Sequence, residues 1–262
     1  MFTAHLGATS VGAVLVSGAA SGIGRATALR LARGGAAVGL LDRDVAGLTL
    51  TAEHAREAGA SGVVQAPADV ASRAEVDAAF ATVVDALGPL DGLVCAAGIL
   101  LPGGLQDTTT ADWDRQLATN STGALHCLQA GATRLRDGGA IVVVSSNAAR
   151  VPRTGMLAYA ASKAATSALA RCAGLELAER GIRCNVVEPG STDTAMQRAL
   201  WPDPDAGATL AVGGDPAAYR VGIPLGRIAD PDDVAAMACF LISPDARHVT
   251  LQQIYVDGGA SL

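Results

Sequence analysis

The stretch that decides the fold is GAVLVSGAASGIGRATALRLARGG, residues 12–35. Its aliphatic start, residues 12–18, predicts a buried strand, and the Ala-rich part that follows predicts a helix. In the turn between them, glycine lets the backbone approach a pyrophosphate closely, and the helix N-terminus offers free N–H groups and a positive dipole end. The glycine spacing, G-x3-G-x-G, differs from the GxGxxG of other dinucleotide folds. The turn nevertheless predicts a dinucleotide site formed by Gly18, Ser21, Gly22, Ile23 and Gly24.

Strands and helices alternate from this turn to the C-terminus. Further strands are predicted at 36–42, 62–70, 90–98, 138–146, 182–190 and 251–259, and helices from after Asp44 to about Gly59 and at 75–88, 111–136, 156–181 and 231–243. Parallel neighbours need long crossover connections, so this alternation predicts one α/β domain over residues 1–262, a Rossmann-like doubly wound parallel sheet. Residues 191–222, rich in Pro, Gly and Asp, are expected to be irregular and to serve as a substrate lid.

Composition and charge exclude several classes of function. The net charge is −6 and no run of Lys and Arg occurs, which argues against a nucleic-acid partner. Every apolar run is shorter than the roughly 18–20 residues of a membrane span, and no positive region precedes the first apolar stretch, so neither a membrane segment nor a secretory signal is expected. The five scattered cysteines form no CxxC pair and suit a cytoplasmic protein. No metal site is predicted, because the four histidines are dispersed: His5, His54, His126 and His248.

Asp42, at the end of the second predicted strand, indicates which dinucleotide is bound. A carboxylate there can accept hydrogen bonds from both hydroxyls of the adenosine ribose, and it would repel a 2′-phosphate. The expected cofactor is therefore NAD rather than NADP. Two alternatives stay open: Asp42 could be an ordinary helix cap, and Arg43 beside it could tolerate a phosphate.

The segment YAASK places Tyr159 and Lys163 on one helix face, four residues apart. A tyrosine with a pKa of about 10 is a poor base at neutral pH, but a neighbouring ammonium and a positive nicotinamide ring favour its phenolate. Ser146 ends the fifth predicted strand, thirteen residues upstream of Tyr159, where it can hold a substrate oxygen. This set predicts oxidation of a secondary alcohol by hydride transfer.

Other motifs accompany this set: the segments SGAASGIG, CAAG (95–98), SSNA (145–148), YAASK and VDGG, and residues Asp69, Val70, Asn120, Pro189 and Gly190. With them the chain resembles the short-chain dehydrogenase/reductase family over nearly its full length. The departures are mild: Ser17 stands where threonine is usual, and Cys95 replaces the first asparagine of NAAG.

The resemblance implies roles for residues beyond the catalytic set. Asp69 and Val70 would hold the adenine, Ala97 and Gly98 would line the cofactor, and the Pro189-Gly190 turn would also contact it. Thr192 and Thr194 would lie at the carboxamide end. Asn120 would position a proton-relay water beside Lys163, which would also bond the nicotinamide ribose. A homotetramer is expected by analogy with the family.

Less generic segments narrow the resemblance. AAGIL, VPRTGMLAY, RCNVVEPGSTDTAMQRALW, GIPLGRIA and HVTLQQIYVDGGASL are similar to the 2,3-dihydro-2,3-dihydroxybenzoate dehydrogenases of catechol-siderophore pathways. The implied reaction oxidises the ring 3-hydroxyl of a cyclohexadiene carboxylate, and the ketone becomes a phenol by tautomerisation. Arg153 is the expected cationic partner of the carboxylate, because Arg can grip it with two parallel bonds, although an exposed surface role is the alternative. Further substrate contacts are expected from Met156, Gln197, Arg198 and Trp201, the last with a packing role as the alternative.

Two departures from that group concern the substrate. Leu101 stands where an arginine is usual, and Glu188 where a small residue precedes Pro-Gly. A buried carboxylate is costly without a cation, so a substrate with a 2-ammonium group would suit Glu188. The favoured substrate is therefore 2,3-dihydro-3-hydroxyanthranilate, in secondary-metabolite biosynthesis, with 2,3-dihydro-2,3-dihydroxybenzoate as the alternative. Glu188 could instead pair with Arg150 or Arg153, or point away. A generic carbonyl reductase and a catalytically silent NAD sensor are more remote hypotheses.

Overall fold

The computed structural model describes residues 11–201 and 203–261. Most of the N-terminal segment considered above for a secretory signal, including His5, lies outside the described residues. Within those ranges, no helix is both long and apolar enough to cross a lipid bilayer.

In the described part of the chain, seven strands form one sheet in the order β3-β2-β1-β4-β5-β6-β7, with every neighbouring pair parallel. The order reverses between β1 and β4, and open parallel sheets bind ligands in the crevice at such a switch point. The predicted doubly wound fold is therefore confirmed. The strands are β1 (Ala13–Ser17), β2 (Ala37–Asp42), β3 (Gly62–Pro67), β4 (Leu90–Cys95), β5 (Leu135–Val144), β6 (Arg183–Pro189) and β7 (Gln253–Val256).

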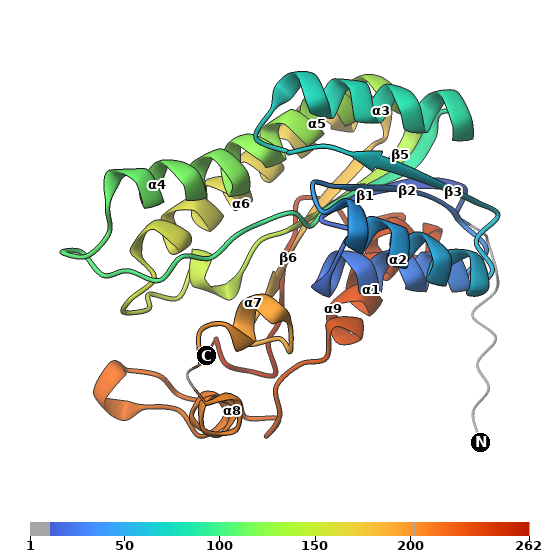
Figure 1. Ribbon diagram of the computed structural model, residues 1–262. Coiled ribbons are helices and arrows are strands. Elements are labelled where there is room, and N and C mark those ends of the chain that lie inside the picture. The colour runs from blue at the N-terminus through green and yellow to red at the C-terminus, as the bar shows by residue number, and fades with distance from the viewer. Residues whose placement is uncertain (1–10, 202, 262) are drawn as a thin grey trace.

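Helices cover both faces of the sheet (Figure 1). Side chains alternate along each strand, so β1 sends Val14 and Val16 to one hydrophobic layer and Leu15 to the other. The layer with Val14 holds α1 (Gly22–Arg33), α2 (Val45–Glu57) and α9 (Pro231–Ile242), and the layer with Leu15 holds α3 (Arg73–Leu87), α5 (Gly123–Arg134) and α6 (Leu157–Leu177).

The helix predicted at 111–136 is not continuous. It consists of α4 (Thr110–Gln116), a π-helical turn (Leu117–Thr122) and α5. A π-turn adds a residue to the helical repeat and redirects the side chains beyond it, and such turns are frequent at functional sites. Here it contains Asn120. The sequence pattern shows the helix but not the change in hydrogen bonding.

The expectation that residues 191–222 are irregular is wrong in part. The segment contains α7 (Ala195–Arg198) and α8 (Pro204–Gly213). The Asp203 side chain accepts from the N–H groups of Asp205 and Ala206, so it caps the start of α8. Gly214, with a φ of 82°, ends the helix. An Asp-Pro start and a glycine stop are a helix signature that the Pro and Gly content obscured.

Candidate active site

The glycine turn between β1 and α1 is built around close backbone contacts. At Gly18 the φ is +72°, and a Cβ there would lie 2.6 Å from the backbone nitrogen of Ala97. At Gly24 a Cβ would overlap the carbonyl of Gly18, so α1 can begin directly behind the turn. Ser21 is the N-cap of α1, but its side chain makes no capping hydrogen bond. The turn leaves a cradle that side chains would fill, which fits an adenine dinucleotide of the kind the family binds.

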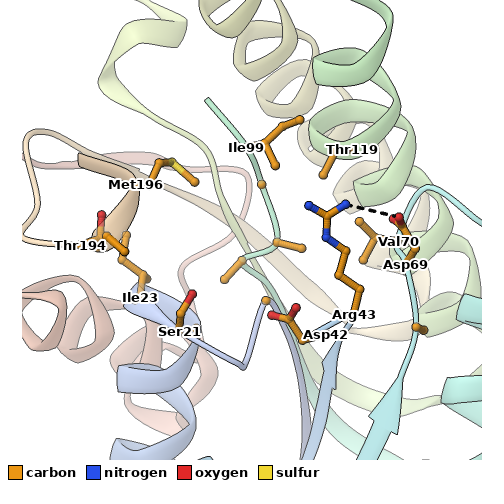
Figure 2. Close-up of a pocket in the computed structure, with 18 residues that line it drawn as sticks. Ser21, Ile23, Asp42, Arg43, Asp69, Val70, Ile99, Thr119, Thr194 and Met196 are labelled. Atoms are coloured by element: carbon orange, nitrogen blue, oxygen red, sulfur yellow. Dashed lines mark ion pairs between the residues drawn. The ribbon is translucent and has the colours of Figure 1, made fainter. Parts of the chain in front are cut away.

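A cleft opens beside this turn at the switch point of the sheet (Figure 2). The Asp42 carboxylate is fixed by accepting from the N–H of Ala20 and from that of Asp44, both at 3.1 Å. Arg43 extends toward Asp69, with its guanidinium nitrogen 3.7 Å from that carboxylate. Ile99, Thr119 and Met196 also line the cleft, although no sequence motif predicted them there. The expected residues that line the cleft are Gly18, Ser21, Gly22, Ile23, Gly24, Asp42, Asp69, Val70, Ala97, Gly98 and Thr194.

Tyr159 and Lys163 lie on α6, where only 8% and 4% of their surfaces are exposed. The Lys163 ammonium donates to the carbonyl of Val144 at 3.0 Å and lies 5.9 Å from the centre of the Tyr159 ring. Burial lowers the pKa of Lys163 to about 8. Burial also raises the pKa of Tyr159, and the Ser146 hydroxyl acts in the opposite direction. A positive charge near the phenol is therefore needed before Tyr159 can act as a base near neutral pH.

Asn120 is buried beside this group and contacts both the segment at Ile99 and α6. Its amide donates to the Ile99 carbonyl and to the Ser162 hydroxyl, both at 2.9 Å, and its side-chain oxygen accepts from the Ile99 N–H at 2.8 Å. A Cβ at Gly98 would lie 3.2 Å from both this oxygen and the Lys163 ammonium. Glycine at position 98 therefore lets Asn120 and Lys163 converge at the cleft.

A second cavity, of about 700 Å³, adjoins the cofactor cleft, and Ile23, Thr194 and Met196 line both. Ser146 and Tyr159 line the second cavity, together with expected residues of the substrate and cofactor sets: Arg153, Met156, Pro189, Gly190, Thr192, Gln197 and Trp201. Arg220 also lines it, and no sequence signal predicted this, because the residue lies in a stretch without a periodic pattern. Burial lowers the pKa of Arg153, and so does the nearby charge of Arg220, while Asp257 acts in the opposite direction.

The similarity of this chain to known proteins identifies its family. A family model described as "Enoyl-(Acyl carrier protein) reductase" matches residues 18–261. The 2,3-dihydro-2,3-dihydroxybenzoate dehydrogenase of Bacillus subtilis is 41% identical, covering 94% of this chain and 95% of that protein, and the one of Escherichia coli is 45% identical, covering 95% and 96%. The chain belongs to the short-chain dehydrogenase/reductase family.

Solved structures of this family superpose on the chain. A dehydrogenase/reductase from Sinorhizobium meliloti, 34% identical, has a TM-score of 0.86 and covers 95% of both chains. A short-chain dehydrogenase from Burkholderia cenocepacia in complex with NADP, 35% identical, has a TM-score of 0.84, covering 95% of this chain and 97% of that one.

Three residues that the sequence predicts at the substrate site lie elsewhere. Leu101 does not line the cavity, although its neighbours Leu100 and Pro102 do; its N–H donates to the Gln116 side chain at 3.0 Å. Arg198 faces away and forms two hydrogen bonds with the Asp193 carboxylate, at 2.6 and 2.7 Å.

Glu188 is also outside the cavity, and its side chain is fully buried. Its carboxylate lies 3.6 Å from the Arg150 guanidinium, so the protein itself supplies the cation that a substrate ammonium was expected to provide. The expectation that Glu188 contacts the substrate is therefore corrected, and the alternative pairing with Arg150 holds.

Proposed function

We propose that the protein is an NAD-dependent dehydrogenase that oxidises the ring 3-hydroxyl of 2,3-dihydro-2,3-dihydroxybenzoate to give 2,3-dihydroxybenzoate. The observation that carries this proposal is the junction of the two cavities: Ser146 and Tyr159 face a chamber with two arginines, directly beside the dinucleotide cleft. The similarity to two dehydrogenases of that name over nearly the whole chain supports the same substrate.

In the proposed reaction the alcohol loses the proton of its hydroxyl group and the hydride of the carbon that bears this group. The Tyr159 phenolate takes the hydroxyl proton, and the Ser146 hydroxyl orients the oxygen. Lys163 provides the positive charge that favours the phenolate. Asn120 holds the backbone of Ile99 in place through two hydrogen bonds. When bound, NAD supplies the hydride acceptor. Tautomerisation of the cyclic ketone to a phenol makes the overall conversion favourable.

The preference for NAD rests on the end of β2. Asp42 presents a fixed carboxylate to the cleft, where it can accept from both ribose hydroxyls and would repel a 2′-phosphate. Arg43 is paired with Asp69, which reduces its ability to compensate a phosphate. These contacts support NAD as the cofactor over the two alternatives that the sequence left open.

Arg153 and Arg220 support an anionic substrate. They line one cavity from different segments, Arg153 from the loop before α6 and Arg220 from the stretch after α8, and neither forms an ion pair within 4.0 Å among the described residues. The charge of Arg220 acts on Arg153, so an anion bound between the two guanidinium groups would relieve their repulsion. A ring carboxylate would meet this need, and we propose that residues 191–222 close over it as a lid.

The amino substrate, 2,3-dihydro-3-hydroxyanthranilate, is the second candidate that the same cavity could take. A substrate ammonium was expected to compensate the charge of Glu188, but Arg150 already does so. Among the described residues that line the cavity, the one carboxylate is Asp203, and its side chain is used to cap α8. The dihydroxy acid is therefore the first substrate to assay.

A panel assay tests the proposal. Formation of NADH or NADPH is followed with 2,3-dihydro-2,3-dihydroxybenzoate, 2,3-dihydro-3-hydroxyanthranilate and a 3-hydroxyacyl thioester, each with NAD and with NADP. We expect kcat/KM to be highest for the dihydroxy acid with NAD. Higher kcat/KM for 2,3-dihydro-3-hydroxyanthranilate would restore this acid as the favoured substrate. Higher kcat/KM for the thioester would indicate a carbonyl reductase. No turnover of any alcohol, with NAD still bound, would indicate a silent sensor.

A further inference from the structure

Three elements that carry active-site residues meet at Glu188. Glu188 lies on β6 and directly precedes Pro189 and Gly190 of the substrate cavity. From α6, Ser167 faces it, one helical turn beyond Lys163. From the loop between Ser146 and Arg153, Arg150 faces it. Because the Glu188 side chain is 0% exposed, this carboxyl group lies at an internal junction and does not touch the substrate.

The contact of Glu188 with Arg150 holds the loop between Ser146 and Arg153. One carboxylate oxygen, Oε2, lies 3.6 Å from the Arg150 guanidinium and accepts no hydrogen bond from the described residues. The same guanidinium stacks over the Tyr255 ring, 4.8 Å from its centre, and Tyr255 pairs in register with Glu188. Arg150 is therefore held between a buried charge and an aromatic face, three residues before Arg153.

The contacts on the inner side lead to the catalytic helix. The other carboxylate oxygen, Oε1, accepts from the Ser167 hydroxyl at 3.1 Å. The Ser167 hydroxyl lies 2.7 Å from that of Ser145, which donates to the Lys163 carbonyl at 2.9 Å. Two hydroxyl groups thus connect Glu188 to the backbone of Lys163, and Ser145 is the neighbour of Ser146.

The number of hydrogens in this chain depends on Glu188. The hydrogen of Ser145 is used on the Lys163 carbonyl, and Ser167 has one hydrogen for two acceptors, Ser145 and Glu188. With Glu188 ionised, one of these two contacts has no hydrogen. With Glu188 protonated, every contact has one, in the order Glu188, Ser167, Ser145 and the Lys163 carbonyl. The ion pair with Arg150 is then lost.

We propose that Glu188 is a positioning residue for the alcohol oxidation: when ionised it anchors the loop of Ser146 and Arg153 through Arg150, and when protonated it releases that loop and completes the hydroxyl chain to α6. The charged and titratable groups that act on this junction are Arg150 from the loop, Arg171 from α6 and Tyr255 from β7. Burial raises the pKa of Glu188, and Ser167 and the two arginines oppose the rise. The change between the ionised and the protonated state of Glu188 is thus expected at a higher pH than for an exposed carboxyl group.

Two variants test this role, with a matched control. Glu188→Gln keeps the size and can donate to Ser167 as the protonated acid would, but it has no charge for Arg150. Arg150→Gln removes the other partner, and its side chain is 47% exposed, so it is the variant less prone to disturb folding. The control, Asp232→Asn, removes an ion pair with Arg30 between α1 and α9 at 2.7 Å, remote from the cavity.

We expect both variants to raise the KM of the acid substrate about tenfold, with kcat within about threefold and NAD affinity unchanged. In the wild type, we expect kcat/KM to fall as the pH drops through the pKa of Glu188. In both variants this decrease of kcat/KM should be absent. The double variant should be no worse than either single one, because both remove the same contact. The control should match the wild type in every respect.

Hydrogen exchange provides a measurement independent of turnover. Amides of residues 147–156 should exchange faster in both variants than in the wild type and the control. Wild-type exchange in both variants would overturn the proposal, whichever substrate the enzyme uses. So would additive effects in the double variant, or an unchanged KM and pH profile in both single variants. If no cyclic acid is oxidised, the proposed function fails, and the exchange measurement alone decides the positioning role.

Discussion

Lys163→Met should make the cofactor-free protein more stable, although it removes a catalytic group. Burial lowers the pKa of this lysine from 10.5 to about 8, so the folded state binds its proton less tightly than the unfolded state. At 1.36 kcal/mol per pKa unit, the charged ammonium destabilises the fold by about 3 kcal/mol near pH 7. Methionine has a similar length and no charge, but it gives up the hydrogen bond to the Val144 carbonyl, about 1 kcal/mol. The net gain is then about 2 kcal/mol.

The pH dependence of this gain separates the charge from packing. Between the two pKa values the unfolded state holds the proton and the folded state releases it, so the wild type gains stability as the pH rises through this range. At about pH 9.5 the cost falls to roughly 1.4 kcal/mol, and the advantage of the variant should almost vanish. Urea unfolding of both proteins at the two pH values measures this. A variant less stable than the wild type at pH 7, or a difference independent of pH, would refute the reasoning.

Asp42→Asn should lower kcat/KM with NAD by about tenfold, the scale of one charge-assisted hydrogen bond, and raise it with NADP; an unchanged ratio of the two would contradict the assignment of Asp42. Arg220→Ala and Arg153→Ala should each raise the KM of the acid about tenfold or more at similar kcat, whereas Leu101→Ala, outside the cavity, should not; equal effects of all three would exclude a two-arginine site. Since burial raises the pKa of Tyr159, kcat/KM for alcohol oxidation should rise with pH in the alkaline range, as stopped-flow NADH absorbance would show.

The sequence was sufficient for the fold because local signals and global topology agree. The glycine turn, the alternation of strands and helices, and the YAASK segment each predict the same arrangement, and the sheet has it. Most residues expected at the cofactor line the cleft, because a parallel sheet fixes where its strand ends lie.

Side-chain direction and long-range pairing were beyond the sequence. Glu188 was expected at the substrate because it stands where the similar dehydrogenases have a small residue before Pro-Gly. Neighbouring strand residues point to opposite faces, however, and Pro189 lines the cavity while Glu188 does not. Arg198 was expected to contact the substrate, but its partner is Asp193, five residues before it. Arg220 could not be placed, because its position depends on how the segment after α8 folds back over the cavity.

The central claim is that Tyr159, assisted by Lys163, takes the proton of a ring hydroxyl. The most direct test is NADH formation from 2,3-dihydro-2,3-dihydroxybenzoate by Tyr159→Phe, with NAD binding measured in parallel. We predict that turnover falls by about two to four orders of magnitude, the contribution typical of a positioned acid–base group, while NAD affinity is retained. Near-normal turnover in this variant would contradict the account.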